Sequence, residues 1–173
     1  MLVASVIGVI IVYVLGCFPQ VARRVPINYI LLFIFAICQS YTVSFIASQY
    51  DATTVLMAAG LTLAIVIALT IYAATTRSDF TTCGGVMIVL GVAIMVGGII
   101  GLFVRNRWLQ LGLSIAGVIV FGMYLVYDTQ LVVGNQNRRY QMDDYIFAAM
   151  GLYINIIQIF VSLLQILGQF QRE

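Results

Sequence analysis

The chain has 173 residues, of which 63% are hydrophobic and only 8% are charged, and its mean hydropathy is +1.10. A soluble domain carries about 25% charged residues and uses them to cover its surface. This composition excludes folding in water and predicts an integral membrane protein. The formal charge of +2 is small, and the sequence has no run of basic residues that could bind along a phosphate backbone. We therefore expect no nucleic acid partner.

The sequence contains no histidine. This removes the most common general base, the usual zinc ligand and the Ser/His and Cys/His catalytic pairs, so we expect neither an enzyme nor a bound cofactor. The three cysteines lie in or beside apolar runs at irregular spacing. Cys17, Cys38 and Cys83 are therefore predicted to be buried small hydrophobic residues.

Six apolar segments follow one another along the chain, each near the length of about 20 residues that crosses a hydrocarbon core. They cover residues 2–18, 28–48, 53–75, 83–104, 108–133 and 144–169. None alternates polar and apolar residues, so each is expected to be a helix rather than a barrel strand. Their connections are short. Residues 1–173 are therefore expected to form a single all-α domain, a polytopic membrane bundle of six transmembrane helices.

Arginine is distributed unevenly over the predicted connections. Five arginines lie in the first, third and fifth connections, and three lie on the opposite side. Because positively charged residues favour the cytosolic side, these three connections are expected in the cytosol and both chain ends outside it or in a lumen.

Glycine is concentrated in the fourth segment. The spacing of Gly97 and Gly101 leaves a bare stripe on one helical face, which allows another helix to approach closely. We expect this packing within the chain, and a dimer interface is the alternative.

Asp128 is the one acidic residue well inside a predicted span. It lies six residues before Gly134, which is about 9 Å inside the cytosolic end of its helix. An ionised side chain within a bilayer is costly unless it faces water or a partner. Two interpretations follow, a protonated carboxyl hydrogen-bonded between helices or a carboxylate in an ion or proton path.

The last helix carries a polar row at spacings of three and four residues, which places it on one face that we expect to point inward. The row is Asn155, Gln158, Ser162 and Gln165. A short connection makes the last two helices antiparallel neighbours. Counting from the helix ends places Asn155 about 7 Å deeper than Asp128.

Acidic residues also precede two predicted helices, at Asp79, Asp143 and Asp144. There they are expected to cap free amides and to interact with the helix dipole. The alternative is a set of acids at a cytosolic pore mouth, where they concentrate cations. Their candidate charge partners are Arg77, Arg138 and Arg139.

Four ordered stretches, 50–62, 76–83, 127–135 and 144–157, resemble the Bax inhibitor family and, within it, the Lifeguard branch. They include the sequence Tyr127, Asp128, Thr129 and, on the last helix, Leu152, Tyr153, Ile154, Asn155. The resemblance implies a bundle, usually of seven transmembrane helices, that leaks calcium in a pH-dependent way and restrains cell death. The start of this chain is similar to the second helix of the family, so the first helix is expected to be absent.

In the family pattern the aspartate at the position of Asp128 pairs with a second aspartate on the last helix, and the two share a proton that holds the pore closed. Here the second position is Asn155, which does not titrate. We therefore expect pH gating to be weakened or to depend on Asp128 alone.

A calcium-permeable leak channel is the leading functional hypothesis, with Asp128, Asn155 and Gln158 as pore or gating residues. Asp128 is the expected ligand of a weakly and transiently bound Ca²⁺, because one carboxylate with an amide and water supplies few oxygen ligands. Calcium is then a permeant ion. The alternative is a non-conducting regulator that binds other membrane proteins. An intramembrane aspartyl protease is disfavoured, since it needs a second carboxylate.

The expected partners are membrane lipid, calcium ions and apoptosis-regulating membrane proteins, with an oligomer as a further candidate because a missing helix leaves a packing face open. The endoplasmic reticulum or Golgi is the expected location, and the plasma membrane is the alternative.

Overall fold

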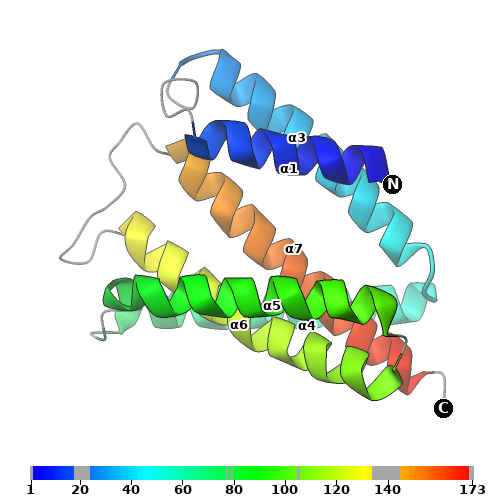
Figure 1. Ribbon diagram of the computed structural model, residues 1–173. Helices are drawn as coiled ribbons and strands as arrows, with labels where there is room; N and C mark the ends of the chain where they lie inside the picture. The colour runs from blue at the N-terminus through cyan, green and yellow to red at the C-terminus, as the bar shows by residue number, and fades with distance from the viewer. Residues whose placement is uncertain are drawn as a thin grey trace.

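The computed structural model describes residues 2–17, 24–76, 78, 80–104, 106–133 and 145–171, and their secondary structure is entirely helical (Figure 1). The elements are α1 (Leu2–Cys17), α3 (Ile27–Ala47), α4 (Ala52–Thr75), the 3-10 turn η1 (Phe80–Cys83), α5 (Gly84–Phe103), α6 (Arg107–Val133) and α7 (Tyr145–Phe170). Each α-helix matches a predicted segment to within one residue at either end. The all-α prediction is confirmed.

Length and hydropathy qualify five of the described helices, α3 to α7, as membrane spans. The described part of α1 has 16 residues, which is about 24 Å at the helical rise and less than a hydrocarbon core of about 30 Å. The prediction of six spans is thus confirmed for five of them. The protein is a polytopic helical membrane protein.

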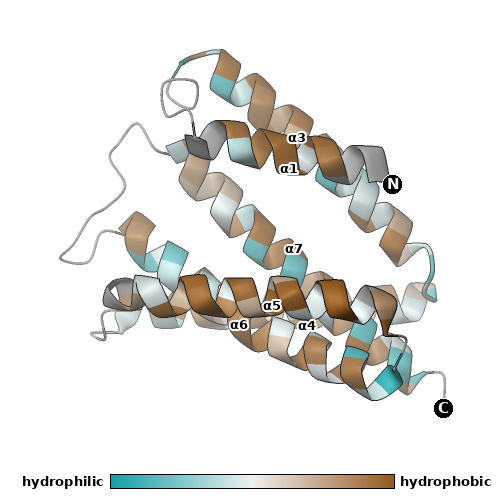
Figure 2. Cartoon of the chain, in the orientation of Figure 1, coloured by the Kyte–Doolittle hydropathy of each residue, from teal (hydrophilic) through white to brown (hydrophobic). Residues whose placement is uncertain are grey.

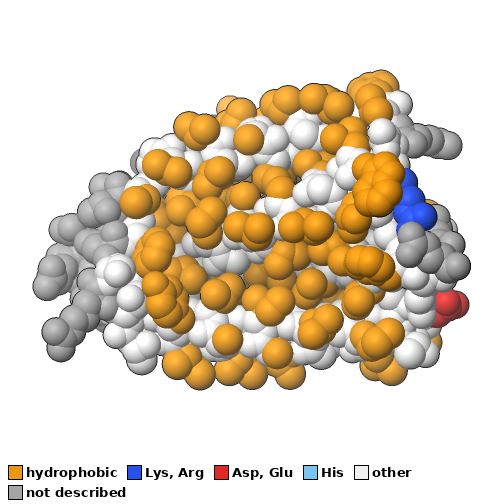
Figure 3. Space-filling view, turned by 90° about the horizontal axis from the view of Figure 1, so that it is seen from below, with side chains coloured by type: hydrophobic (Ala, Val, Ile, Leu, Met, Phe, Trp, Pro, Cys, Tyr) orange, Lys and Arg blue, Asp and Glu red, His pale blue; other side chains and the backbone are white. Residues whose placement is uncertain are grey.

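Apolar side chains cover the outside of these helices. Hydrophobic residues predominate along α5 and the middle of α1 in Figure 2, and in Figure 3 they spread over much of the visible face, with the charged side chains in view at one end. Leu56 is 73% exposed and Ile88 is 68% exposed. Such a surface is expensive in water but not in lipid, which indicates that it faces the hydrocarbon core.

Helix α7 joins two groups of helices. It packs along α6 and α4, while α5 packs on α6. At its other end α7 contacts α3, which pairs with α1 (Figure 1). There, Ile11, Phe35 and Met150 form a buried cluster with one residue from each of these three helices. The prediction that the last two helices are neighbours is confirmed.

Successive connections between the helices lie at opposite ends of the molecule, as the sequence predicted. The turn between α3 and α4, the connection between α5 and α6, and the end of α7 lie at one end of the molecule (Figure 1). Asp128 is five residues from the last residue of α6, and so lies toward the opposite end. Which end faces the cytosol stays a prediction.

The glycine stripe of α5 faces α6. A Cβ atom at Gly97 would lie 2.7 Å from Leu113 Cδ1, and one at Gly101 would lie 3.4 Å from Leu113 Cδ2. A side chain at Gly97 would force Leu113 to move, and one at Gly101 would just touch it, so the stripe serves close packing within the chain, as the first interpretation predicted.

The prediction of buried cysteines is wrong for Cys83. This residue is exposed and Cys38 is partly buried, and both are free thiols. Cys83 ends the η1 turn, where the chain changes direction before α5 and leaves its side chain at the surface. The side chain of Cys17 lies outside the described structure.

Candidate functional site

Asp128 and Asn155 meet at the interface of α6 and α7. The side-chain amide Nδ2 of Asn155 donates a hydrogen bond of 2.7 Å to Oδ2 of Asp128. Asn155 is only 5% exposed, and Asp128 is partly buried. This hydrogen bond links the two helices at this level.

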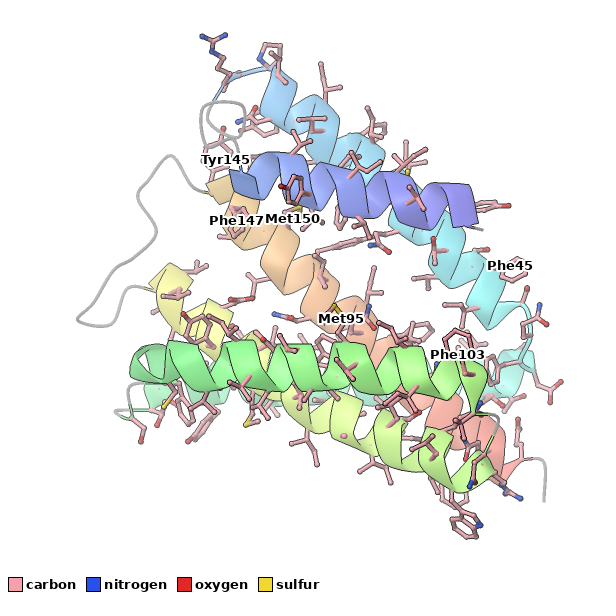
Figure 4. All side chains as sticks on the ribbon, viewed as in Figure 1. Phe45, Met95, Phe103, Tyr145, Phe147 and Met150 are labelled. Carbon is pink, nitrogen blue, oxygen red and sulfur yellow. The ribbon has the colours of Figure 1, made fainter. Side chains whose placement is uncertain are left out.

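The predicted difference in depth between these residues is wrong. Counting from helix ends assumes that the ends of neighbouring helices are level, but α7 crosses α6 obliquely (Figure 1). The first turn of α7 lies against α3 instead, where Asn28 Nδ2 donates a hydrogen bond of 3.0 Å to the hydroxyl of Tyr145. Figure 4 labels Tyr145 at this end of α7. The tilt brings Asn155 level with Asp128.

Gly151 makes room for the Asp128 carboxylate. A Cβ atom on Gly151 would lie 2.9 Å from Oδ2 of Asp128 and 3.6 Å from its Cγ, closer than a comfortable carbon–oxygen contact of about 3.3 Å or more. The sequence analysis missed this residue. Its position four residues before Asn155 puts it on the same helical face, a signal that was available from the spacing.

Two tyrosines near Asp128 on α6 contact α5 rather than α7. The hydroxyl of Tyr124 donates a hydrogen bond to the carbonyl oxygen of Met87. The hydroxyl of Tyr127 lies 3.2 Å from the position of a Cβ on Gly84. This segment of α6 therefore contacts α5 through its tyrosines and α7 through its aspartate.

A groove of about 460 Å³ opens between α5, α6 and α7. Its lining includes Asn155, Gln158 and Gly151 from α7, Tyr124 from α6 and Met95 from α5, which is labelled in Figure 4. The Asp128 carboxylate is hydrogen-bonded to one of these groups, Asn155, and lies beside another, Gly151. The structure thus brings the three predicted gating residues, Asp128, Asn155 and Gln158, to one place.

The polar row of α7 faces α6 over its whole length. Asn155 and Ser162 are buried, and Gln165, although exposed, accepts a hydrogen bond of 2.8 Å at Oε1 from the hydroxyl of Ser114. Gly117 lies against Ser162, since a Cβ on this glycine would be 2.7 Å from Ser162 Oγ. The row forms a polar seam between the two helices.

Gln130 is a second residue whose role the sequence analysis missed. Its side chain is 2% exposed. Its Oε1 accepts a hydrogen bond of 2.9 Å from the backbone N–H of Phe80, and its Nε2 donates one of 2.9 Å to the carbonyl oxygen of Ser78. It fixes the connection between α4 and α5 to α6, two residues beyond Asp128. A buried amide in an apolar span was the available signal.

Several predicted residues lie outside the described structure. They are the acids Asp79, Asp143 and Asp144 and the arginines Arg77, Arg138 and Arg139. Their roles as caps or as a pore mouth stay predictions. Within the described ranges, no group of three or more His, Cys, Asp or Glu side chains forms a metal site. Asp128 with neighbouring amide oxygens can offer a cation only weak coordination.

A bundle of lipid-facing helices, with one carboxylate hydrogen-bonded between its last two helices, defines a multi-pass membrane protein with an intramembrane polar site. The family model described as "Inhibitor of apoptosis-promoting Bax1" matches residues 1–172. The chain belongs to this family, whose members are membrane proteins rather than enzymes. The resemblance noted in the sequence is confirmed.

Individual relatives agree with this assignment. The chain is 35% identical over 170 residues to Protein lifeguard 3 of Homo sapiens, an alignment that covers 96% of this chain and 55% of that protein. Protein lifeguard 3 of Mus musculus is 37% identical over 158 residues, covering 89% and 51%. The Golgi anti-apoptotic protein of Vaccinia virus (strain Lister) is 32% identical over 142 residues, covering 82% and 58%. The chain spans about half the length of these curated relatives.

Proposed function

We propose that this protein provides a calcium-permeable leak across a membrane and thereby restrains cell death. The observation that supports the proposal is the hydrogen bond between Asp128 and Asn155 at the wall of an intramembrane groove. A carboxylate is expensive in this setting and is typical of ion paths. The restraint of cell death is carried over from the relative named as a Golgi anti-apoptotic protein, whose name also favours the Golgi as the location.

The pair forms the gate in this proposal. With the amide of Asn155 on Oδ2 of Asp128, α6 and α7 are held together and the carboxylate is occupied. A Ca²⁺ ion that enters the groove competes for this carboxylate, and the amide oxygens of Asn155 and Gln158 supply further hard ligands. Few ligands give weak binding, which allows the ion to leave again.

The test is calcium flux into liposomes that contain the purified chain. Asp128→Asn removes the charge at the gate, and we expect flux to fall about tenfold, the change that corresponds to 1.4 kcal/mol. Asp51→Asn is the matched control, because it makes the same chemical change at the exposed N-cap position of α4. Its flux should equal that of the unmodified chain.

Two results would contradict the proposal. If the Asp128→Asn variant conducted calcium as fast as the unmodified chain, the Asp128 carboxylate would not lie in the conduction path. No flux from well-folded chain would instead favour the alternative, a non-conducting regulator that binds other membrane proteins. In cells, protection from death that persists in the Asp128→Asn variant would separate the protective activity from conduction.

A further inference from the structure

A second polar pocket lies at the end of the bundle opposite to Asp128. It has a volume of about 330 Å³ and is lined by residues of α5, α6 and α7 and by the turn before α4. Its polar and glycine lining comprises Tyr50, Gly98, Gly101, Gln110, Gln165, Gly168 and Gln169. Three glutamines line this one pocket within an otherwise apolar bundle. Their amide groups favour a polar occupant that can form hydrogen bonds.

One amide oxygen of these glutamines lacks a partner among the described residues. Oε1 of Gln169 is buried and accepts no hydrogen bond from the described part of the chain. A buried acceptor without a donor costs about 1–3 kcal/mol, and a lipid acyl chain offers no donor. Water fits both the chemistry and the size, since one molecule needs far less than the volume present.

The polar seam leads from this pocket toward Asp128. Along α7 its residues Asn155, Gln158, Ser162 and Gln165 recur at spacings of three and four, and Gln169 continues this spacing into the pocket. The fourteen residue steps from Asn155 to Gln169 span about 21 Å. Between this pocket and the groove at Asp128, Gly117 of α6 lies against Ser162 of the seam, since a Cβ on Gly117 would be 2.7 Å from Ser162 Oγ.

We propose that this pocket is a water-filled entrance for the permeant cation on the side of the membrane opposite to Asp128. Its neutral amide oxygens accept hydrogen bonds from the hydration shell of the ion. The ion reaches the Asp128 groove along the α6–α7 seam when the contact between Gly117 and Ser162 opens. This inference rests on the proposed leak function and adds its second mouth.

Thiol labelling tests for water in the pocket without depending on flux. In a chain whose native cysteines Cys17, Cys38 and Cys83 are replaced by serine, Gly98→Cys places a thiol in the pocket, where a Cβ meets no atom within 4 Å. Ile99→Cys is the matched control at the same depth, because Ile99 is 50% exposed on the apolar surface. The probe is a charged, membrane-impermeant methanethiosulfonate added to intact liposomes.

We expect Gly98→Cys to react at least about tenfold faster than Ile99→Cys, because only a thiol in contact with water forms the reactive thiolate. Labelling should also lower calcium flux through Gly98→Cys and not through Ile99→Cys. Gln110→Cys is a second pocket variant should Gly98→Cys fail to fold, and it should behave in the same way.

Equal, slow labelling of both positions would show a dry pocket and overturn the proposal. Fast labelling of Gly98→Cys that leaves an existing flux unchanged would also overturn it, since the water would then lie off the path. Fast labelling of a chain that conducts no calcium would instead refute the leak function itself, so the two failures are distinguishable.

Discussion

Replacing Gly117 by alanine tests whether α6 and α7 touch as closely as the polar seam requires. The new Cβ would lie 2.7 Å from Oγ of Ser162 and 3.5 Å from its Cβ. The first distance is shorter than a comfortable carbon–oxygen contact of about 3.3 Å or more, so the Ser162 hydroxyl must turn away or the helices must separate. Overpacking of this kind costs about 1–3 kcal/mol, and we expect the free energy of unfolding to fall by that amount.

The clash involves one atom of Ser162, its Oγ, and a second substitution removes this atom. Ser162→Ala deletes the hydroxyl and leaves the Cβ contact of 3.5 Å, which is close to the optimal separation of two carbon atoms. In the Ser162→Ala background, Gly117→Ala should therefore cost little. The two substitutions should show a coupling energy of about 1–2 kcal/mol, within the range for residues in contact.

The assay is equilibrium unfolding by denaturant in detergent micelles. It compares the unmodified chain, the two single variants and the double variant. Gly112→Ala is the control on the same helix, because a Cβ there meets no atom within 4 Å, and alanine should be neutral or stabilising. Additive effects of Gly117→Ala and Ser162→Ala would refute the reasoning, since they would mean that the two residues do not touch.

Three further substitutions probe the site. Gly151→Ala should push the Asp128 carboxylate away from Asn155, because its Cβ would lie 2.9 Å from Oδ2. Because this loosens the pair that holds α6 and α7 together, we expect calcium flux to rise severalfold in liposomes. Gln130→Leu leaves two backbone groups of the α4–α5 connection without their partner and should lower the free energy of unfolding by about 2 kcal/mol. Asn155→Asp replaces the 2.7 Å donor–acceptor contact with two carboxylate oxygens, which repel by about 6 kcal/mol at an effective dielectric constant of about 20. A shared proton should join this pair at low pH, and its loss as pH rises should separate the helices and increase flux.

Each of these variants has a matched control. Gly60→Ala adds a methyl group in open space and should leave flux unchanged. Gln49→Leu removes an exposed amide and should leave stability unchanged. Asn106→Asp introduces an acid outside the spans and should not alter the pH response. A pH response of Asn155→Asp equal to that of the unmodified chain would disprove the contact between positions 155 and 128.

The helices were predictable because apolar length alone requires them in a membrane. The sequence predicted part of the pairing of Asp128 with Asn155, because a short connection makes α6 and α7 neighbours. Their common depth did not follow, because the tilt of α7 depends on its contact with α3, which is distant in the sequence. The same limit applies to Gln130, whose partners lie 50 and 52 residues away.

The contact between α3 and α7 couples the first helices to the site mechanically. Phe35 of α3 packs edge-on against Tyr153 of α7, with ring centroids 5.9 Å apart, only two residues from Asn155. Because a helix is stiff over such a short distance, a displacement of α3 that carries Tyr153 with it also moves the amide that binds Asp128. If Asp128 and Asn155 form the proposed gate, lipids or proteins that press on the outer face of α1 and α3 will also shift Asn155 relative to Asp128.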